Sequence, residues 1–444
     1  MLSRVLDAAE ALSPLEAVEG VTGALAASLG ADASFFLIAD MSGRGLVRLS
    51  HVGPGESVQS GVRFDDEERG VVLPFDGGPA EEAMRTQTVQ VLRPAGGGCW
   101  WRVLAPVTER GEVLGLLQMS LPFEPDGGVL AQIAQVAHVL SFVVIANRRH
   151  TDLYEWGQRT TRFTLPAEIQ RRLLPPAFTC EAGAFTLSAW LEPASSIGGD
   201  TFDYSLGRNG LHLSVTDAMG HGVASALTAT LCVGSLRNSR RAGSSLLEQA
   251  AAANLALFEH ASGSGAESFS TGLLGRLDLR TGYLSMVNAG HVAPYLWRAG
   301  RVRAVHLPSD VPLGLFRDSV YRSTDVRLEP GDRLVLVTDG MLERDAAGVD
   351  LSAEVARTRL LHPRETTRCL TDMVLEACGP DLADDATLLI LDWHGGHGNG
   401  RVTVAGAEPS YASAPRGAPQ LRPTARRGGP GPSAQPVPSR VARP

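Results

Sequence analysis

Lysine is absent from this 444-residue chain, and arginine supplies all 40 of its Lys and Arg positions. Without a lysine ammonium the chain cannot form a Schiff base, and it cannot build a Walker-type phosphate loop. A long acidic block is also missing, and the net charge is only −8 at pH 7. We therefore expect no nucleic-acid partner.

Cysteine is scarce and scattered. The cysteines form no Cys-x-x-Cys pair, which zinc sites and redox motifs commonly use. An odd number of cysteines at wide spacing favours reduced thiols in a cytoplasm over a disulfide framework. Met1 to Leu12 also lacks the charged-then-apolar pattern of a secretion signal. We therefore expect a cytoplasmic protein with free thiols at Cys99, Cys180, Cys232, Cys369 and Cys378.

Long apolar runs are rare, and one stretch, Val129 to Ala146, is apolar enough to test as a membrane span. It contains Gln132, Gln135 and His138, and its apolar positions also suit a packed helix. We predict a helix inside a soluble domain and no membrane partner.

What the chain does contain is enough apolar sequence, 44% of its residues, for two domains with extra segments. The first part has the order helix, strands, helix. We predict a helix before Gly30, a strand, a hairpin around Glu109 to Glu112 and a closing helix, in the ranges Leu15 to Leu29, Ser34 to Ile38, Trp101 to Ser120 and Asp126 to Asn147.

This arrangement resembles a GAF sensor domain over residues 13–147. The resemblance implies an α/β sensor domain, but His51 and Cys99 are each single, and no haem, chromophore or cyclic-nucleotide signature is present. A dimerising or protein-binding domain is the alternative interpretation.

Residues 148–176 form the predicted connector. Arg148 to Leu174 reads as one charged helix that stops at Pro175-Pro176. It contains enough apolar positions to pair with a second copy, so a homodimer is a candidate state. Such a helix either transmits a signal to the following domain or acts as a passive tether.

Residues 177–394 contain many strands and two helical blocks, Val223 to Arg240 and Leu246 to His260. Strands and helices do not alternate regularly, so we predict an α+β layered sandwich. Residues 395–444 are rich in Gly, Pro and Arg without apolar periodicity, which predicts a disordered basic tail.

Four aspartate motifs in this second domain each place an acid beside small residues at a strand end. Hard divalent cations prefer oxygen ligands, and glycines leave room for a hydrated ion. A single Asp-Gly is usually a turn, but four such motifs point to a metal site. They are Ile197-Gly198-Gly199-Asp200, Thr216-Asp217-Ala218-Met219-Gly220-His221-Gly222, Thr338-Asp339-Gly340 and Asp384-Asp385-Ala386-Thr387.

These motifs, with Asn288-Ala289-Gly290-His291 and Pro312-Leu313-Gly314 between them, occur in the order seen in bacterial PPM-type phosphatases. The chain thus resembles the SpoIIE/RsbU-like relatives of protein phosphatase 2C over about residues 165–393. The resemblance implies an α-β-β-α sandwich with two Mn²⁺ or Mg²⁺ ions at one end.

The resemblance also implies roles. Asp217 would bridge both metals, and the carbonyl of Ala218 would complete one coordination shell. Asp339 and Asp384 would hold the second metal, while Asp200 would orient metal-bound water.

Three further positions stay open. Asp385 is the neighbour that could be confused with Asp384, and we expect it just outside the ligand set. His221 could be a proton donor to the leaving group, although its offset from Asp217 differs from that of the catalytic His in eukaryotic relatives. His291 fits a structural hydrogen-bonding role better, and no arginine that grips phosphate can be identified.

The predicted reaction is hydrolysis of phosphoserine or phosphothreonine by metal-activated water, without a covalent intermediate. By the resemblance, the substrate would be a phosphorylated anti-sigma factor antagonist in a partner-switching pathway that controls a sigma factor. A catalytically inactive, signal-regulated binding module and a hydrolase of small phosphate esters are the alternatives.

Overall fold

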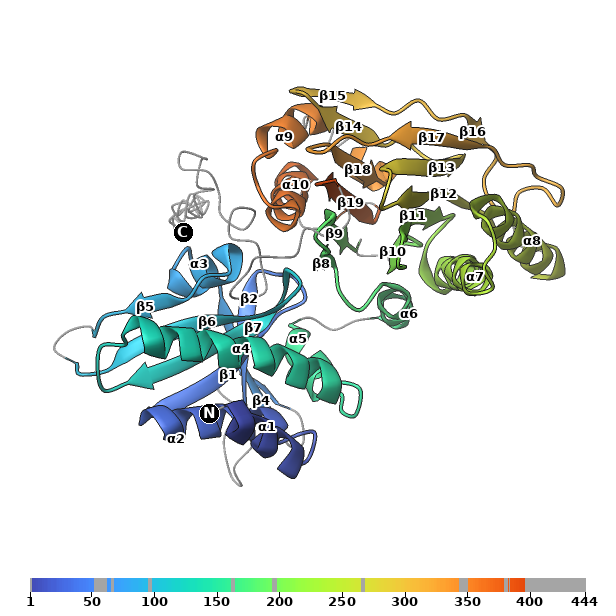
Figure 1. Cartoon of the computed structure of the whole chain (residues 1–444). Helices are drawn as coiled ribbons and strands as arrows, with labels where there is room; N and C mark the ends of the chain where they lie inside the picture. Colours follow the sequence, from blue (N-terminus) through green and yellow to red (C-terminus); the bar gives the residue numbers. More distant parts are fainter. Residues whose placement is uncertain are drawn as a thin grey trace, which may run out of the picture.

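The structure, a computed structural model, describes residues 2–51, 62–64, 68–94, 98–160, 164–193, 198–264, 268–342, 350–378, 382 and 384–395. Two domains follow one another along the chain, joined by two short helices (Figure 1). Apart from Gly395, the predicted disordered tail lies outside the described residues, so it stays a prediction.

The N-terminal domain is built on an antiparallel sheet with the described strand order β3-β4-β2-β1-β7-β6-β5. Helices α1, α2 and α4 share a core with one face, while α3 packs on the other. The strands are β1 (Ala33–Ala39), β2 (Gly45–His51), β3 (Val62–Phe64), β4 (Glu68–Pro74), β5 (Gln90–Leu92), β6 (Trp101–Glu109) and β7 (Glu112–Leu121). The helices are α1 (Leu2–Ala11), α2 (Ala17–Leu29), α3 (Pro79–Thr86) and α4 (Gly127–Asn147).

The predicted elements of this domain are present. Helix α2 ends at Gly30, whose φ of 62° lies in the left-handed region that glycine tolerates. The predicted hairpin joins β6 to β7 through Arg110 and Gly111. The predicted start at residue 13 is too late, because α1 packs on α2 and buries Val5.

Helix α4 is the one described helix long and apolar enough to cross a membrane, by length and composition alone. In the structure it lies along β6 and contributes to the domain core, and Asp126 caps its first turn by accepting from the Val129 amide. Its buried side chains include Ile133, Val136, Leu140 and Val144. The packing is that of the predicted core helix.

The prediction of one continuous connector helix over 148–174 is wrong. The segment contains two short helices, α5 (Leu153–Gln158) and α6 (Leu165–Leu173). Arg159 leaves α5 in an extended conformation, and Pro166 lies in the first turn of α6, where proline starts rather than continues a helix. The predicted stop is correct, since Leu174 is extended before Pro175.

The C-terminal domain is the predicted α+β sandwich of two sheets. In the described part, the first sheet has the order β10-β11-β12-β13-β16 with β17 beside β13, and the second β15-β14-β18-β19-β9-β8. The first contains β10 (Thr201–Leu206), β11 (Gly210–Ala218), β12 (Ser270–Asp278), β13 (Tyr283–Ala289), β16 (Ser309–Asp310) and β17 (Ser323–Arg327). The second contains β8 (Thr179–Glu181), β9 (Phe185–Glu192), β14 (Tyr295–Arg298), β15 (Arg301–Ala304), β18 (Arg333–Val337) and β19 (Ala386–Trp393).

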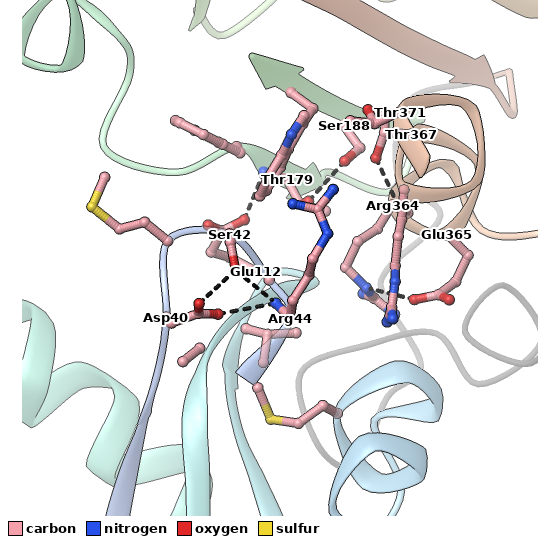
Figure 2. Close-up of a pocket in the computed structure, with 18 of the residues that line it drawn as sticks. Asp40, Ser42, Arg44, Glu112, Thr179, Ser188, Arg364, Glu365, Thr367 and Thr371 are labelled. Carbon is pink, nitrogen blue, oxygen red and sulfur yellow. Dashed lines mark hydrogen bonds and ion pairs between the residues drawn. The ribbon is translucent and has the colours of Figure 1, made fainter. Parts of the chain in front are cut away.

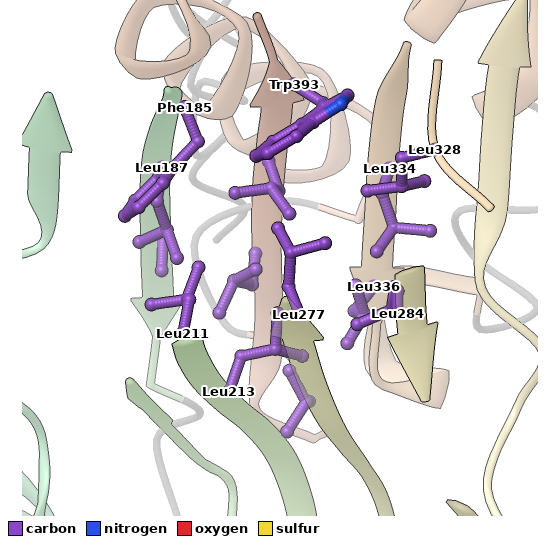
Figure 3. Packing of buried hydrophobic residues seen from close by; sticks show 14 of the residues in the cluster. Phe185, Leu187, Leu211, Leu213, Leu277, Leu284, Leu328, Leu334, Leu336 and Trp393 are labelled. Carbon is purple, nitrogen blue, oxygen red and sulfur yellow. The ribbon is translucent and has the colours of Figure 1, made fainter. Parts of the chain in front are cut away.

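Helices cover both outer faces of this sandwich (Figure 1). Helices α7 (Gly222–Arg241) and α8 (Leu246–Ser264) contact the first sheet, and α9 (Leu351–Arg357) and α10 (Pro363–Cys378) contact the second. The core between the sheets is almost purely aliphatic and aromatic, and Figure 3 shows side chains from both sheets meeting there. This rigid stack fixes the strand ends that carry the aspartates.

The two domains touch where the β6–β7 hairpin meets β8, an edge strand of the second sheet. The Glu181 amide donates to the Arg110 carbonyl over 2.9 Å, and the Thr179 amide donates to Glu112 Oε2 over 2.7 Å. Helix α10 reaches across as well, since Arg364 Nη1 donates to the Gly111 carbonyl at 2.8 Å. The hairpin tip therefore satisfies backbone groups of an edge strand that would otherwise need water or another partner.

Candidate metal centre

The four aspartate motifs come together at one end of the sandwich. Asp217 lies near the end of β11, and Asp200 immediately precedes β10, which pairs with β11 in antiparallel register. On the second sheet, Asp339 follows β18 and Asp384 precedes β19, and these two strands also pair. Each carboxylate thus comes from a strand end, as the sequence predicted.

Hydrogen bonds join the two sheets at this end. The Thr338 hydroxyl donates to Asp200 Oδ2 over 2.7 Å, and the Thr387 amide donates to the Thr338 hydroxyl over 3.0 Å. Asp200 is 2% exposed, so this network fixes a buried carboxylate from one sheet against strand ends of the other.

The site concentrates negative charge. Burial and repulsion by Asp339, Asp384 and Asp385 raise the pKa of Asp217 from 3.8 to about 7. Burial, followed by repulsion from Asp217 and Asp385, raises the pKa of Asp200 well above its ordinary value. The pKa of Asp384 is raised by burial, and by Asp385 and Asp339. The charges that act on these three groups are all acidic, which is the environment that divalent cations neutralise.

The candidate ligands are all oxygen donors, which hard divalent cations prefer. Among the described residues, no three His, Cys, Asp or Glu side chains are gathered closely enough to enclose an ion by themselves. Mg²⁺ typically uses one or two carboxylates and keeps several waters, so a sparse all-oxygen set is suitable for it. The same residues offer no sulfur or imidazole cage of the kind that structural zinc requires.

The paired acids Asp384 and Asp385 differ in their surroundings. Asp385 is 1% exposed and accepts hydrogen bonds from Gln170 Nε2 at 2.5 Å and from the Gly198 amide at 3.2 Å. Asp384 is half-buried, and one of its oxygens accepts from the Asp385 amide. Asp384 is therefore the more accessible candidate ligand, while Asp385 is held within the protein.

Glycine is required where the loops approach one another. A Cβ on Gly199 would lie 2.5 Å from the Ala218 carbonyl oxygen and 2.3 Å from Ser225 Oγ. Ser225 Oγ donates to the Ala218 carbonyl over 3.1 Å. The second lone pair of this carbonyl oxygen is then left for another partner. Any larger residue at position 199 would displace the candidate backbone ligand.

The two histidines of the motifs have different places. His221 is exposed at the position before helix α7, so it is available to a substrate but is not fixed by a side-chain cap hydrogen bond. His291 is buried, and burial lowers its pKa to about 4, so it is neutral. Its Nε2 lies 3.1 Å from the Val337 carbonyl, and its Nδ1 lies 2.7 Å from Thr271 Oγ1. It joins β12 to β18, in the structural manner predicted.

Gln170 is the contact that sequence reasoning missed. This buried side chain of α6 donates from Nε2 to Asp385 Oδ2 and, over 2.8 Å, to the Asp200 carbonyl. A lone amide in a charged helix gives no sequence signal, because its partner is 215 positions away along the chain. Through it, the connector touches the carboxylate cluster directly.

Comparison with known proteins finds a family match over most of the C-terminal domain. Residues 207–394 match the family model described as "Stage II sporulation protein E (SpoIIE)". The C-terminal domain is therefore of the PPM type. Within that class it belongs to the SpoIIE family.

Two curated relatives come from Bacillus subtilis (strain 168). Phosphoserine phosphatase RsbP is 25% identical over 167 residues, which are 36% of this chain and 40% of RsbP. Phosphoserine phosphatase RsbU is 22% identical over 270 residues, which are 58% of this chain and 79% of RsbU. The matched part thus spans two fifths of RsbP.

Solved structures are also similar. The RsbU and RsbW domains of Rv1364c from Mycobacterium tuberculosis are 24% identical with a TM-score of 0.43, covering 53% of this chain and 65% of that one. The SiaA-PP2C domain of Pseudomonas aeruginosa is 22% identical with a TM-score of 0.43, covering 51% and 93%.

Proposed function

We propose that this protein is a metal-dependent phosphatase that hydrolyses phosphoserine or phosphothreonine in another protein. The observation that carries the proposal is that acidic residues at several strand ends converge on one place. The pKa values of Asp200, Asp217 and Asp384 are raised there, and no positively charged side chain is among the described groups that shift them. The SpoIIE-family match and the phosphoserine phosphatase names of the two relatives support it.

The proposed cofactors are two Mn²⁺ or Mg²⁺ ions. When bound, such ions lower the pKa of water and offset the charge of phosphoryl oxygens, which is the chemistry that phosphate hydrolysis needs. Asp217 and the Ala218 carbonyl would hold one ion, and Asp339 and Asp384 would hold the other with help from Asp217. Asp200 would orient the attacking water from its fixed position beside Thr338.

A protein substrate suits the accessibility of this end. Asp339 and His221 are exposed, so a phosphorylated loop of a partner could reach them from solvent. We propose a phosphorylated anti-sigma factor antagonist as that partner, in keeping with the sequence resemblance. The N-terminal domain would act as the GAF-like sensor, and the cytoplasm is the proposed compartment because all five cysteines are free thiols.

The test measures phosphate release by the full chain from phosphoserine and phosphothreonine peptides and from nucleotides, with and without Mn²⁺. We expect Mn²⁺-dependent release from the peptides that EDTA abolishes, with little from the nucleotides. Asp217→Asn should remove the activity, whereas Asp318→Asn, at an exposed acid outside the four aspartate motifs, should retain it. Release that survives exhaustive chelation, or a preference for nucleotides, would contradict the proposal.

A further inference from the structure

A cavity of about 170 Å³ lies between the two domains, away from the carboxylate cluster. Its walls come from the loop between β1 and β2, from α3, from α6, from strands β8 and β9 and from α10. Figure 2 shows Arg44 reaching from the N-terminal domain toward the wall that carries Ser188, Thr367 and Thr371. A cavity near 150 Å³ is large enough for a benzene-sized molecule.

Four of the five arginines that line this cavity form ion pairs. Its lining contains five arginines, 44, 85, 171, 364 and 368, and four acids, 40, 112, 365 and 372. Two of the acids are engaged by arginines: Asp372 with Arg44 and Arg368, and Glu365 with Arg85 and Arg364. Two acids beside the lining pair with the same group, Glu192 with Arg44 and Glu81 with Arg85 and Arg368.

The other two acids are held by polar groups of the backbone. Asp40 accepts from the amides of Arg44 and Gly45, and Glu112 accepts from the Thr179 amide. Glu112 also attracts Arg171 electrostatically, although no ion pair or hydrogen bond between the two occurs among the described residues.

Arg171 is the arginine of this lining that is left without a directly bonded partner in the described parts of the chain, although Glu112 and Glu155 attract it. Within the described part of the chain it makes no ion pair or hydrogen bond, and its guanidinium lies over the Phe178 ring at 4.8 Å. Burial lowers its pKa, but an arginine stays charged at any physiological pH. The buried hydroxyl of Thr371, in the same lining, also has no hydrogen-bond partner among the described residues.

The rest of the wall is apolar. Phe75, Met84, Phe178 and Trp190 line the same space, so a ligand there would bury a hydrophobic body beside one cation. We propose that this interdomain cavity binds a small organic monoanion, a carboxylate of about benzoate size, with its carboxylate on Arg171 and its planar or branched body among the aromatic side chains.

The site has a route to the carboxylate cluster. Arg171 follows Gln170 in α6, and Gln170 contacts Asp385 and the Asp200 carbonyl. A ligand that pairs with Arg171 would hold α6 in the position in which Gln170 makes these contacts. This consequence rests on the proposed phosphatase function, whereas binding itself does not.

The experiment measures binding by calorimetry and by the intrinsic tryptophan fluorescence of the full chain without metal, to which Trp190 in the cavity wall contributes. The probes are benzoate and 3-methylbutanoate, with benzamide as the neutral match of benzoate and inorganic phosphate as a compact anion. We expect saturable binding of the carboxylates below about 10 mM, and at least tenfold weaker binding of benzamide and phosphate, since an ion pair and an apolar body are both required.

Adjacent arginines provide a matched pair of variants. Arg171→Gln should weaken benzoate binding at least tenfold, and Arg171→Lys should restore part of it. Arg172→Gln should bind as the wild type does, because Arg172 points to Glu155 and Glu168 on the exposed side. The benzoate–benzamide comparison on the wild-type chain needs no variant, so misfolding of Arg171→Gln would not leave the proposal untested.

Any of three results would contradict the proposed binding site. They are no carboxylate binding up to 10 mM, binding of benzamide as tight as that of benzoate, or an equal loss of benzoate affinity in the Arg171 and Arg172 variants. A separate assay follows peptide dephosphorylation, in which benzoate should lower the Mn²⁺ concentration needed for half-maximal turnover. Binding without that shift would overturn the coupling alone, and absence of any Mn²⁺-dependent turnover would instead overturn the proposed function.

Discussion

Asp217 lies where three other carboxylates oppose its ionisation, and this gives it a testable pH dependence. Its pKa is raised to about 7 in the folded protein, against 3.8 ordinarily. The folded state therefore binds this proton more tightly than the unfolded chain does. Its stabilising effect is complete below about pH 4 and is lost as the pH rises through about 7.

We predict that metal-free wild-type protein melts at progressively lower temperature between pH 4 and pH 8, and that Asp217→Asn flattens this decline. Thermal denaturation in EDTA across that range measures the effect. With Mn²⁺, the variant should lose more than about 100-fold in turnover, since even outer-shell changes reduce activity about 10- to 100-fold. A variant that keeps the wild-type pH profile would show that Asp217 is not part of the repelling cluster.

At the scale of residues, the acidic positions could be predicted because each one is marked locally. Asp200, Asp217 and Asp339 have glycine or small neighbours and adjoin apolar strands, and such strands end at a common edge. Gln170 could not be predicted, because nothing near it in sequence reveals its partner. The different roles of Asp384 and Asp385 likewise could not be predicted. They depend on which of the two carboxylates is buried, and packing rather than composition decides this.

Helix α6 is the element through which the cluster and the connector communicate, and it yields the next prediction. Gln170→Leu should leave the buried Asp385 carboxylate with one donor fewer, which destabilises the protein by about 1–3 kcal/mol. The affinity for Mn²⁺ should fall about tenfold, as for outer-shell changes generally. Urea denaturation and a Mn²⁺ titration of turnover measure the two effects.

Glu168→Gln is the control for this variant. It alters the same helix, but Glu168 is partly exposed and pairs with Arg159 and Arg172 at the surface, where ion pairs contribute little. If both substitutions changed the Mn²⁺ requirement equally, the effect would belong to the helix as a whole and not to the Gln170 contacts.

Among the helices and strands, most predicted ends agree with the structure, whereas the predicted connector helix does not. Helices α2, α4, α7 and α8 lie within a few residues of their predicted ranges, because strong apolar patterns and glycine turns mark them. The prediction of one connector helix failed because charged and apolar residues continue at helical spacing across the break between α5 and α6. Since the two helices are not continuous, a helical phase shift introduced near Gln158 would not rotate α6, so regulation by rigid rotation is not supported.

At the scale of the whole molecule, the contact between the domains is the feature that no local pattern predicted. It joins positions far apart, such as Arg44 with Asp372 and Arg85 with Glu365. The hairpin could be predicted, but its use as a cover for edge strand β8 depends on how two separately folded units meet.

The last prediction concerns Glu112, whose buried carboxylate accepts the Thr179 amide of β8. Glu112→Ala leaves that amide without its acceptor, at a cost of about 1–3 kcal/mol. Hydrogen exchange at residues 179–181 should therefore accelerate about 5- to 150-fold. Glu109→Gln, on the same hairpin and paired with neighbouring Arg110, should leave this exchange unchanged.

Glu112→Gln extends the test to pH, because glutamine can still accept the amide hydrogen bond without a charge. Burial raises the pKa of Glu112 above 4.5, so its contribution to docking is complete below that pH and weakens as the pH rises through the raised pKa. Hydrogen-exchange protection of residues 179–181, taken relative to the β19 amides, should be equal in the wild type and in Glu112→Gln near pH 4. At pH 8 it should be greater in Glu112→Gln. Unaltered protection in both Glu112 variants would mean that the Glu112 carboxylate does not hold the hairpin on β8, and the domains would then be held by α6 and by the contacts of α10.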